Sequence, residues 1–96
     1  MRPSIALNLH LLAIREIFKR FCVDKPRIFG SVLHGTDTDE SDLDTLVDAR
    51  PGTTLFDLGG LQMELEDLLG VRVDLLTPGD LSSKLRERIL SEAQAL

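Results

Sequence analysis

Two short polar motifs, each set beside an apolar run, constrain the fold of this chain more than any other feature. Gly30-Ser31 directly follows Ile28-Phe29, and Asp42-x-Asp44 is followed closely by Leu46-Val47. Ten residues separate the two motifs. Short apolar runs bounded by glycine and polar residues are typical of strands. The sequence therefore predicts a strand, a tight turn and loop, and then a second strand that carries the acidic pair.

The acidic pair has the spacing of a metal site. Residues two apart in a strand point to the same face, so Asp42 and Asp44 would lie about 6.5 Å apart along it. Two carboxylates at this separation repel each other, and either a proton or a divalent cation relieves the repulsion. Mg2+ takes carboxylate oxygens and completes its shell with waters and substrate phosphates. The pair therefore predicts metal ligands.

The glycine–serine pair has the chemistry of an anion cradle. Gly30 allows the backbone to approach a ligand closely. We expect one helical turn from Val32 that ends at Gly35 as its C-cap, with free N–H groups and the Ser31 hydroxyl directed at an anion. A carboxylate pair beside such a cradle indicates a nucleoside triphosphate site.

Together these motifs resemble the signature of the DNA polymerase β-like nucleotidyltransferase superfamily. The longer pattern, Phe29-Gly30-Ser31 through Ser41-Asp42-x-Asp44 and into an aliphatic strand, is similar to that of its smallest members, the minimal nucleotidyltransferases. The resemblance extends from about residue 9 to the end of the chain. It implies a mixed sheet packed with helices, ATP as the substrate and Mg2+ as the metal, in a two-metal site. Many members act as the antitoxin beside an all-helical HEPN-type ribonuclease toxin.

A third carboxylate, Asp74, interrupts the apolar run of residues 71–76. A carboxylate in such a strand needs a partner or a metal. The resemblance implies that Asp74 shares the catalytic metal with Asp42 and Asp44 and helps deprotonate the attacking hydroxyl. The alternative is a surface ion pair between Asp74 and Arg72, which have the same parity in the strand.

The chain departs from the family at His34, where minimal nucleotidyltransferases commonly have arginine. We expect His34 to bind the nucleotide together with Gly30, Ser31 and Gly35. Arginine is a permanent, bidentate phosphate ligand, whereas histidine is only partly charged near neutral pH. The phosphate-binding task therefore shifts in part to another cation, for which the candidates are Arg72, Lys84 and Arg86.

Two functions remain open. In the first, the chain transfers AMP from ATP to a hydroxyl of a partner protein, which by resemblance is a HEPN-type toxin. In the second, the chain is a binding module with weak or absent catalysis that neutralises its toxin by docking. His34 favours the module, and the intact acidic set favours the enzyme.

The element order predicts an α/β or α+β fold, αβαβαβα, in a single domain over residues 1–96. We expect a first helix with Ser4 as its N-cap and a long helix that begins with a Thr54/Asp57 capping box and ends at Gly70. The last helix is expected to start at Asp80. Its predicted buried face comprises Leu81, Leu85, Ile89 and Ala93.

Charge and composition exclude several classes of function. The net charge is −5, and residues 37–80 hold twelve acidic and two basic side chains, which argues against direct nucleic-acid binding. We expect the loop residues Asp37, Asp39 and Glu40 to be solvated. The single cysteine, Cys22, excludes an internal disulfide and fits a reducing cytoplasm. No run is apolar enough for a membrane span. Either a homo-oligomer or a hetero-oligomer with the toxin is compatible with the sequence.

Overall fold

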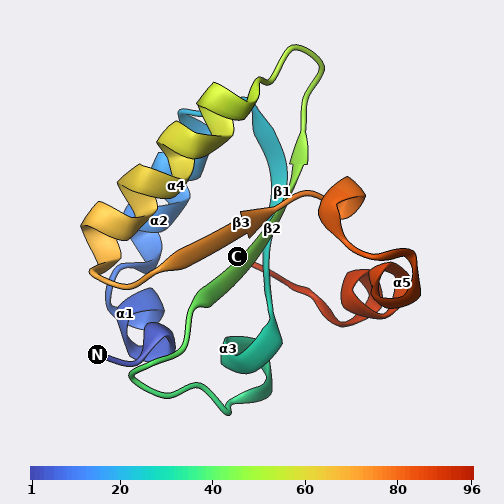
Figure 1. Cartoon of the computed structure of the whole chain (residues 1–96). Coiled ribbons are helices and arrows are strands. Elements are labelled where there is room, and N and C mark those ends of the chain that lie inside the picture. The colour runs from blue at the N-terminus through green and yellow to red at the C-terminus, as the bar shows by residue number, and fades with distance from the viewer.

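The computed structural model describes all of residues 1–96. Three helices lie on one side of a small β-sheet, a fourth helix and a 3-10 turn lie on the other, and a short helix lies at the lower end of the sheet (Figure 1). The elements in chain order are α1 (Pro3–Leu9), α2 (Leu11–Lys19), β1 (Val23–Phe29), α3 (Gly30–His34), β2 (Leu43–Ala49), α4 (Leu55–Leu69), β3 (Val73–Leu76), η1 (Pro78–Asp80), α5 (Ser83–Glu92) and β4 (Gln94–Ala95).

The sheet is mixed, as the family resemblance implied. Its strand order is β3-β2-β1-β4. The β1 and β2 strands pair antiparallel, β1 and β4 also pair antiparallel, and β2 and β3 pair parallel. Parallel neighbours need a long crossover connection, and α4 provides it between β2 and β3. The β2 strand thus lies between β1 and β3, with the predicted site residues at its amino end.

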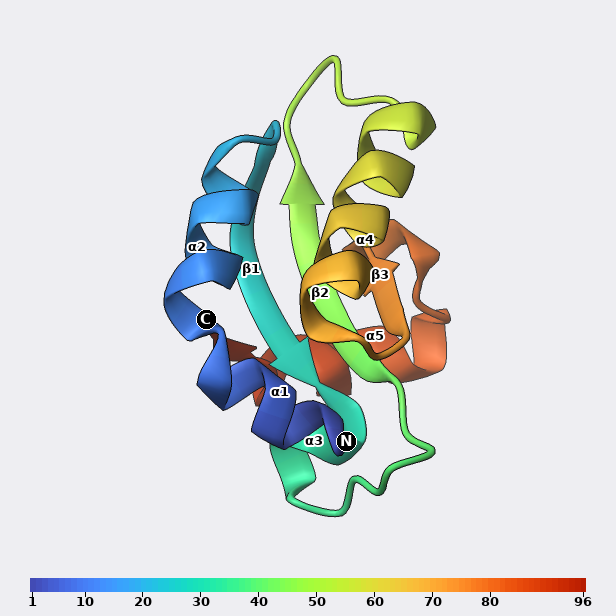
Figure 2. The same cartoon turned by 90° about the vertical axis from the view of Figure 1, so that its left-hand side faces the viewer.

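The main core lies between the sheet and the layer of α1, α2 and α4 (Figure 2). Side chains from alternate strand positions meet one face of each helix there, as expected for a sheet covered on one side. The α4 helix begins with the predicted Thr54/Asp57 capping box and ends at Gly70 in the left-handed conformation (φ 68°). The buried members of this core include Ile14, Phe18, Leu43, Val47, Leu61, Leu65 and Val73.

The first helix differs from its prediction at both its start and its middle. It is divided at His10, whose φ of −118° is not helical, into α1 and α2. Ser4 is not the N-cap, since that position is Arg2. The cap comes from the loop instead, because the Asp37 carboxylate accepts hydrogen bonds from the Ser4 N–H (2.9 Å) and from the Arg2 guanidinium (3.2 Å). Asp37 is therefore buried rather than solvated.

The C-terminal segment also differs from its prediction. Asp80 does not cap the last helix but closes η1, where its carboxylate accepts hydrogen bonds from the Thr77 N–H and hydroxyl. The α5 helix begins later, at Ser83, and has no fully buried residue. Leu81 is buried with Phe29 and Leu46 in a small second core, whereas Leu85 is exposed. None of the helices has the length and apolar character that crossing a bilayer requires.

Candidate active site

The register between β1 and β2 brings the two sequence motifs into contact. Phe29 pairs with Asp44, so Gly30 begins its turn beside the Asp44 side chain. Gly30 adopts a left-handed φ of +71°, and a Cβ added there would lie 3.1 Å from Asp44 Cγ and closer still to Asp44 Oδ2. Only glycine fits this position, because any side chain would be strained and would overlap the carboxylate. The turn backbone therefore lies directly against Asp44.

Asp44 also has a carboxylate neighbour on its other side. It is the register partner of Asp74 in the parallel pair of β2 and β3, so both side chains lie on the same face of the sheet. The next residue, Thr45, is 1% exposed and points to the opposite face. Its hydroxyl donates a hydrogen bond to the Asp74 carbonyl oxygen (3.0 Å). Thr45 thus fixes the backbone that carries Asp74.

Asp42 lies just before β2 and is engaged by Arg72. The Arg72 Nε donates a hydrogen bond to Asp42 Oδ1 (3.0 Å), so Arg72 pairs with Asp42 and not with Asp74. The side chains are 80% and 39% exposed, and an exposed pair of this kind contributes little to stability. Asp42 can therefore leave Arg72 for a cation at small cost. In the arrangement described, no three acidic, histidine or cysteine side chains gather closely enough to hold a metal ion.

The electrostatics of Asp44 favour the loss of its negative charge. Burial, together with the nearby carboxylates of Asp74 and Asp42, raises the pKa of Asp44 to about 6. A bound proton or a bound cation would each relieve this cost. Carboxylate oxygens are the donors that Mg2+ prefers. The donor set of Asp42, Asp44 and Asp74 therefore fits a hard divalent cation, with Asp42 turning from Arg72 to join it.

The predicted nucleotide-binding residues lie on α3 and at its end. Gly30 and Ser31 form the first turn of α3, and Gly35 ends the helix with a φ of 71°. His34 faces α5, where its Nε2 lies 3.2 Å from Glu92 Oε2. Between α3 and α5 is a depression of about 240 Å3 that Gly30, His34, Arg88 and Glu92 line. The turn that contacts Asp44 therefore also borders a hollow with charged walls.

The cations proposed from the sequence as substitutes for the family arginine are engaged or distant. Arg72 binds Asp42. Arg86 donates hydrogen bonds to the carbonyl oxygens of Pro78 (2.9 Å) and Leu81 (3.0 Å), and so it holds the start of α5 in place. Lys84 does not line the hollow, whereas Arg88 does. Arg88 was missed from the sequence, although its spacing of four from Glu92 is a recognisable helical ion pair.

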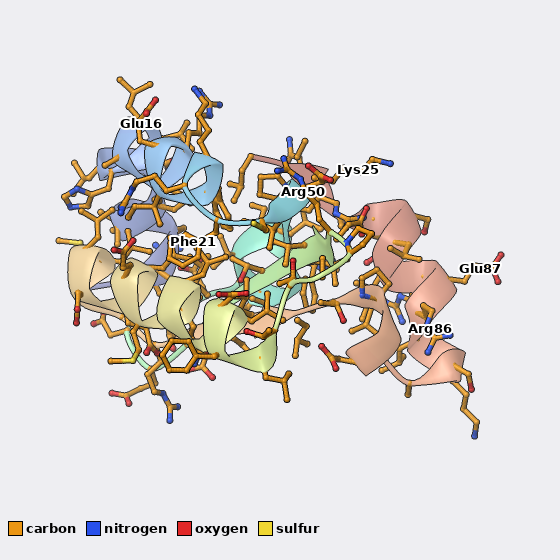
Figure 3. All side chains as sticks on the ribbon, turned by 90° about the horizontal axis from the view of Figure 1, so that it is seen from above. Glu16, Phe21, Lys25, Arg50, Arg86 and Glu87 are labelled. Carbon is orange, nitrogen blue, oxygen red and sulfur yellow. The ribbon has the colours of Figure 1, made fainter.

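A larger depression of about 380 Å3 lies at the other end of β1. Basic residues line it, including Arg15, Lys19, Lys25 and Arg50 (Figure 3 labels the last two). None of the residues predicted for the site borders it. The hollow beside Gly30 is therefore the one that belongs to the candidate active site.

Comparison with known proteins identifies the family to which this chain is similar. The family model described as "Nucleotidyltransferase domain" matches residues 10–96. A protein of Methanocaldococcus jannaschii named "Putative protein adenylyltransferase MJ0435" is 42% identical over 83% of this chain and 86% of its own length. "Protein adenylyltransferase MntA" of Thermococcus cleftensis is 37% identical over 81% of this chain and 79% of its own length.

Solved structures give the same family. One described as a "putative minimal nucleotidyltransferase" superposes with a TM-score of 0.82 at 38% identity, over 97% of this chain and 93% of the other. A toxin–antitoxin structure with AMP-PNP superposes with a TM-score of 0.72 over 85% of this chain and 68% of the other. Its 23% identity makes that likeness one of fold. The chain belongs to the nucleotidyltransferase domain family and is one of its minimal members.

Proposed function

We propose that this chain transfers AMP from ATP to a hydroxyl of a partner protein. The observation that carries the proposal is the position of Asp44, which lies against the Gly30 turn on one side and opposite Asp74 on the other. This arrangement supports the proposal, because nucleotidyl transfer needs a turn that can accept phosphate beside a carboxylate pair. The relatives named protein adenylyltransferases support the choice of AMP and of a protein acceptor.

Each residue of the site has a role in this reaction. Asp42, Asp44 and Asp74 would hold Mg2+, which when bound supplies positive charge to the transferring phosphoryl group. The turn of Gly30 and Ser31 lets the backbone approach the triphosphate. The new bond joins the acceptor oxygen to the α-phosphorus, the bond to the β-phosphate bridging oxygen breaks, and pyrophosphate leaves. The acceptor proton passes to a carboxylate, for which Asp74 is the exposed candidate.

The acceptor in this proposal is a HEPN-type toxin, and the chain acts as its antitoxin. Support comes from the family resemblance and from toxin–antitoxin structures that share the fold, among them one of MntA with HepT. Modification of a toxin hydroxyl would add negative phosphate charge to the toxin, which opposes RNA binding. The free Cys22 is consistent with action in the reducing cytoplasm.

A second candidate function is neutralisation by docking alone. Two observations favour it: Arg72 already neutralises Asp42 in an ion pair, and His34 replaces the family arginine. In this alternative the acidic surface of the chain covers the basic RNA-binding surface of the toxin. The carboxylates of the site would then contribute charge and no chemistry.

A growth assay separates the two functions. The protein encoded by the neighbouring gene is expressed as the toxin, together with wild type or with an Asp42→Asn/Asp44→Asn variant. For the enzyme, wild type restores growth and the variant does not, although the variant accumulates and still copurifies with the toxin. Equal rescue by both forms would favour docking. A matched Asp39→Asn/Glu40→Gln variant controls for the loss of two charges.

A further inference from the structure

We infer that Arg88 of α5 binds the phosphates of the nucleotide in place of the arginine that His34 replaces, and that Glu92 holds Arg88 at the site until the nucleotide arrives. This inference rests on the proposed function and assigns one more residue to the same site. Its basis is an ion-pair network between two helices that are far apart in the sequence and border the Gly30 turn.

The network has Glu92 at its centre. One carboxylate oxygen, Oε2, lies 3.2 Å from His34 Nε2, and the other, Oε1, accepts a hydrogen bond from Arg88 Nε at 3.2 Å. A single carboxylate therefore sits between two potential cations. Carboxylate and phosphate oxygens are bound by the same donors, so Glu92 occupies the position that an anionic ligand would take.

The surroundings of the network fit a phosphate-bearing ligand. The hollow of about 240 Å3 between α3 and α5 reaches Gly30, the residue whose backbone contacts Asp44. Leu85 and Ile89 line the same hollow and give it an apolar wall. The contact between His34 and Glu92 brings α3, at the lower end of β1 in Figure 1, beside α5. Phosphates placed at the Gly30 turn would therefore extend toward Arg88.

Arg88 is better suited to this task than the other cations of the region. Arg86 is bound to two backbone carbonyls, and Arg72, which pairs with Asp42, does not line the hollow. Arg88 has a side chain that is 68% exposed, and its only hydrogen-bond partner is Glu92. An exposed pair of this kind is weak, so a triphosphate can displace the carboxylate. The guanidinium then gains a more highly charged partner in bidentate geometry.

The test is calorimetric titration of the full chain with AMP, ADP and ATP in Mg2+ at low ionic strength. Arg88→Gln should weaken ATP binding about five- to tenfold, ADP binding less and AMP binding little, because the lost contact is to the outer phosphates. Arg15→Gln removes an exposed arginine from α2 and should change none of the three affinities. A uniform loss for all three nucleotides would indicate a structural defect and would overturn the assignment.

Two further variants test the roles of Glu92 and His34. Glu92→Gln should tighten ATP binding about two- to fivefold, because it removes the anion that competes with phosphate. Glu87→Gln, whose side chain points away from the sheet, is the matched control and should have no effect (Figure 3). His34→Arg should restore the ATP affinity lost in Arg88→Gln, because both side chains reach the same carboxylate.

The outcomes distinguish this inference from the proposed function. If wild type binds ATP with Mg2+ and Arg88→Gln binds it equally well, the assignment of Arg88 is wrong and the nucleotide site stands. If wild type binds no nucleotide at all, the proposed function fails and the assignment fails with it. Unchanged urea midpoints for Arg88→Gln and Glu92→Gln would show that the fold is intact.

Discussion

Asp44 of β2 and Asp74 of β3 are register partners in the one parallel pair of strands, and their carboxylates share one face of the sheet. The relationship follows from topology, because α4 returns the chain so that β3 runs beside β2 in the same direction. Two residues that are thirty positions apart in the sequence thus become neighbours, and one of them, Asp44, also lies against the Gly30 turn. Burial of Asp44 and repulsion from Asp74 together raise the pKa of Asp44.

The first prediction concerns the pH dependence of stability without metal. The pKa of Asp44 is raised from 3.8 to about 6, so the folded state holds this proton more tightly than the unfolded chain does. The contribution of Asp44 to stability is therefore largest below about pH 4 and is lost as the pH rises to about 6. Asp44→Asn should equal wild type near pH 4 and exceed it at pH 7.5, by at most about 3 kcal/mol.

Urea unfolding in EDTA at a series of pH values measures this difference. Asp39→Asn, which alters an exposed loop carboxylate, is the control and should track wild type at every pH. A stability gain for Asp44→Asn that is the same at pH 4 and pH 7.5 would show that the carboxylate is not strained by its neighbours.

The second prediction concerns metal and nucleotide together. ATP should bind detectably only when Mg2+ or Mn2+ is present, because the carboxylates of Asp42, Asp44 and Asp74 repel bare triphosphate. Calorimetric titrations with Mg2+ and with EDTA make the comparison. Equal ATP affinity in the two conditions would exclude these carboxylates as the metal site.

The third prediction contrasts two glycines. Gly59 lies inside α4, and a Cβ added there would meet no atom within 4 Å, so Gly59→Ala should raise the free energy of unfolding by about 0.5–1 kcal/mol through helix propensity. Gly30→Ala should lower it by more than about 1 kcal/mol, because alanine is strained at the φ of +71° and meets Asp44. Thermal and urea unfolding of both variants give the values. Similar effects at the two positions would contradict the described Gly30 turn.

The fourth prediction concerns the buried hydroxyl beneath Asp74. Thr45→Val keeps the shape of the side chain and removes the hydrogen bond to the Asp74 carbonyl, so it should destabilise the protein by about 1 kcal/mol. Thr36→Val, in an exposed loop, should stay within about 0.5 kcal/mol of wild type. If Thr45→Val is as stable as wild type, Thr45 does not hold β3 in place.

The parts of the fold that were predictable depend on local sequence signals. The Thr54/Asp57 capping box, the Gly70 and Gly35 helix ends and the contact of the Gly30 turn with the acidic strand follow from short-range patterns. The capping box and the helix ends depend on residues a few positions apart. The contact of the Gly30 turn with the acidic strand depends on two strands that a short loop connects. The assignment of Asp74 to the site rests on the family resemblance, because its position beside Asp44 depends on the parallel pairing of β2 with β3.

The misplaced parts depend on contacts between distant residues. Asp37 has the sequence context of a solvated loop residue, and only its contact with the N-terminal helix buries it. The strand pattern places Arg72 and Asp74 on one face, but the Arg72 side chain binds Asp42 instead. The two-residue strand β4 is too short to show any periodicity, and only its pairing with β1 defines it. The position of Glu92 near the site could not be predicted from the sequence, because it depends on the packing of α5 against α3.

Intact-mass spectrometry of the partner toxin tests the central claim, adenylyl transfer, most directly. The protein encoded by the neighbouring gene, as the proposed toxin, is incubated with ATP, Mg2+ and either wild type or Asp42→Asn/Asp44→Asn. The account predicts that wild type adds one or more AMP units to the toxin and that the variant, still folded and still bound to it, adds none. An unmodified toxin after incubation with wild type, while both forms inhibit it equally, would contradict the account and leave docking as the function.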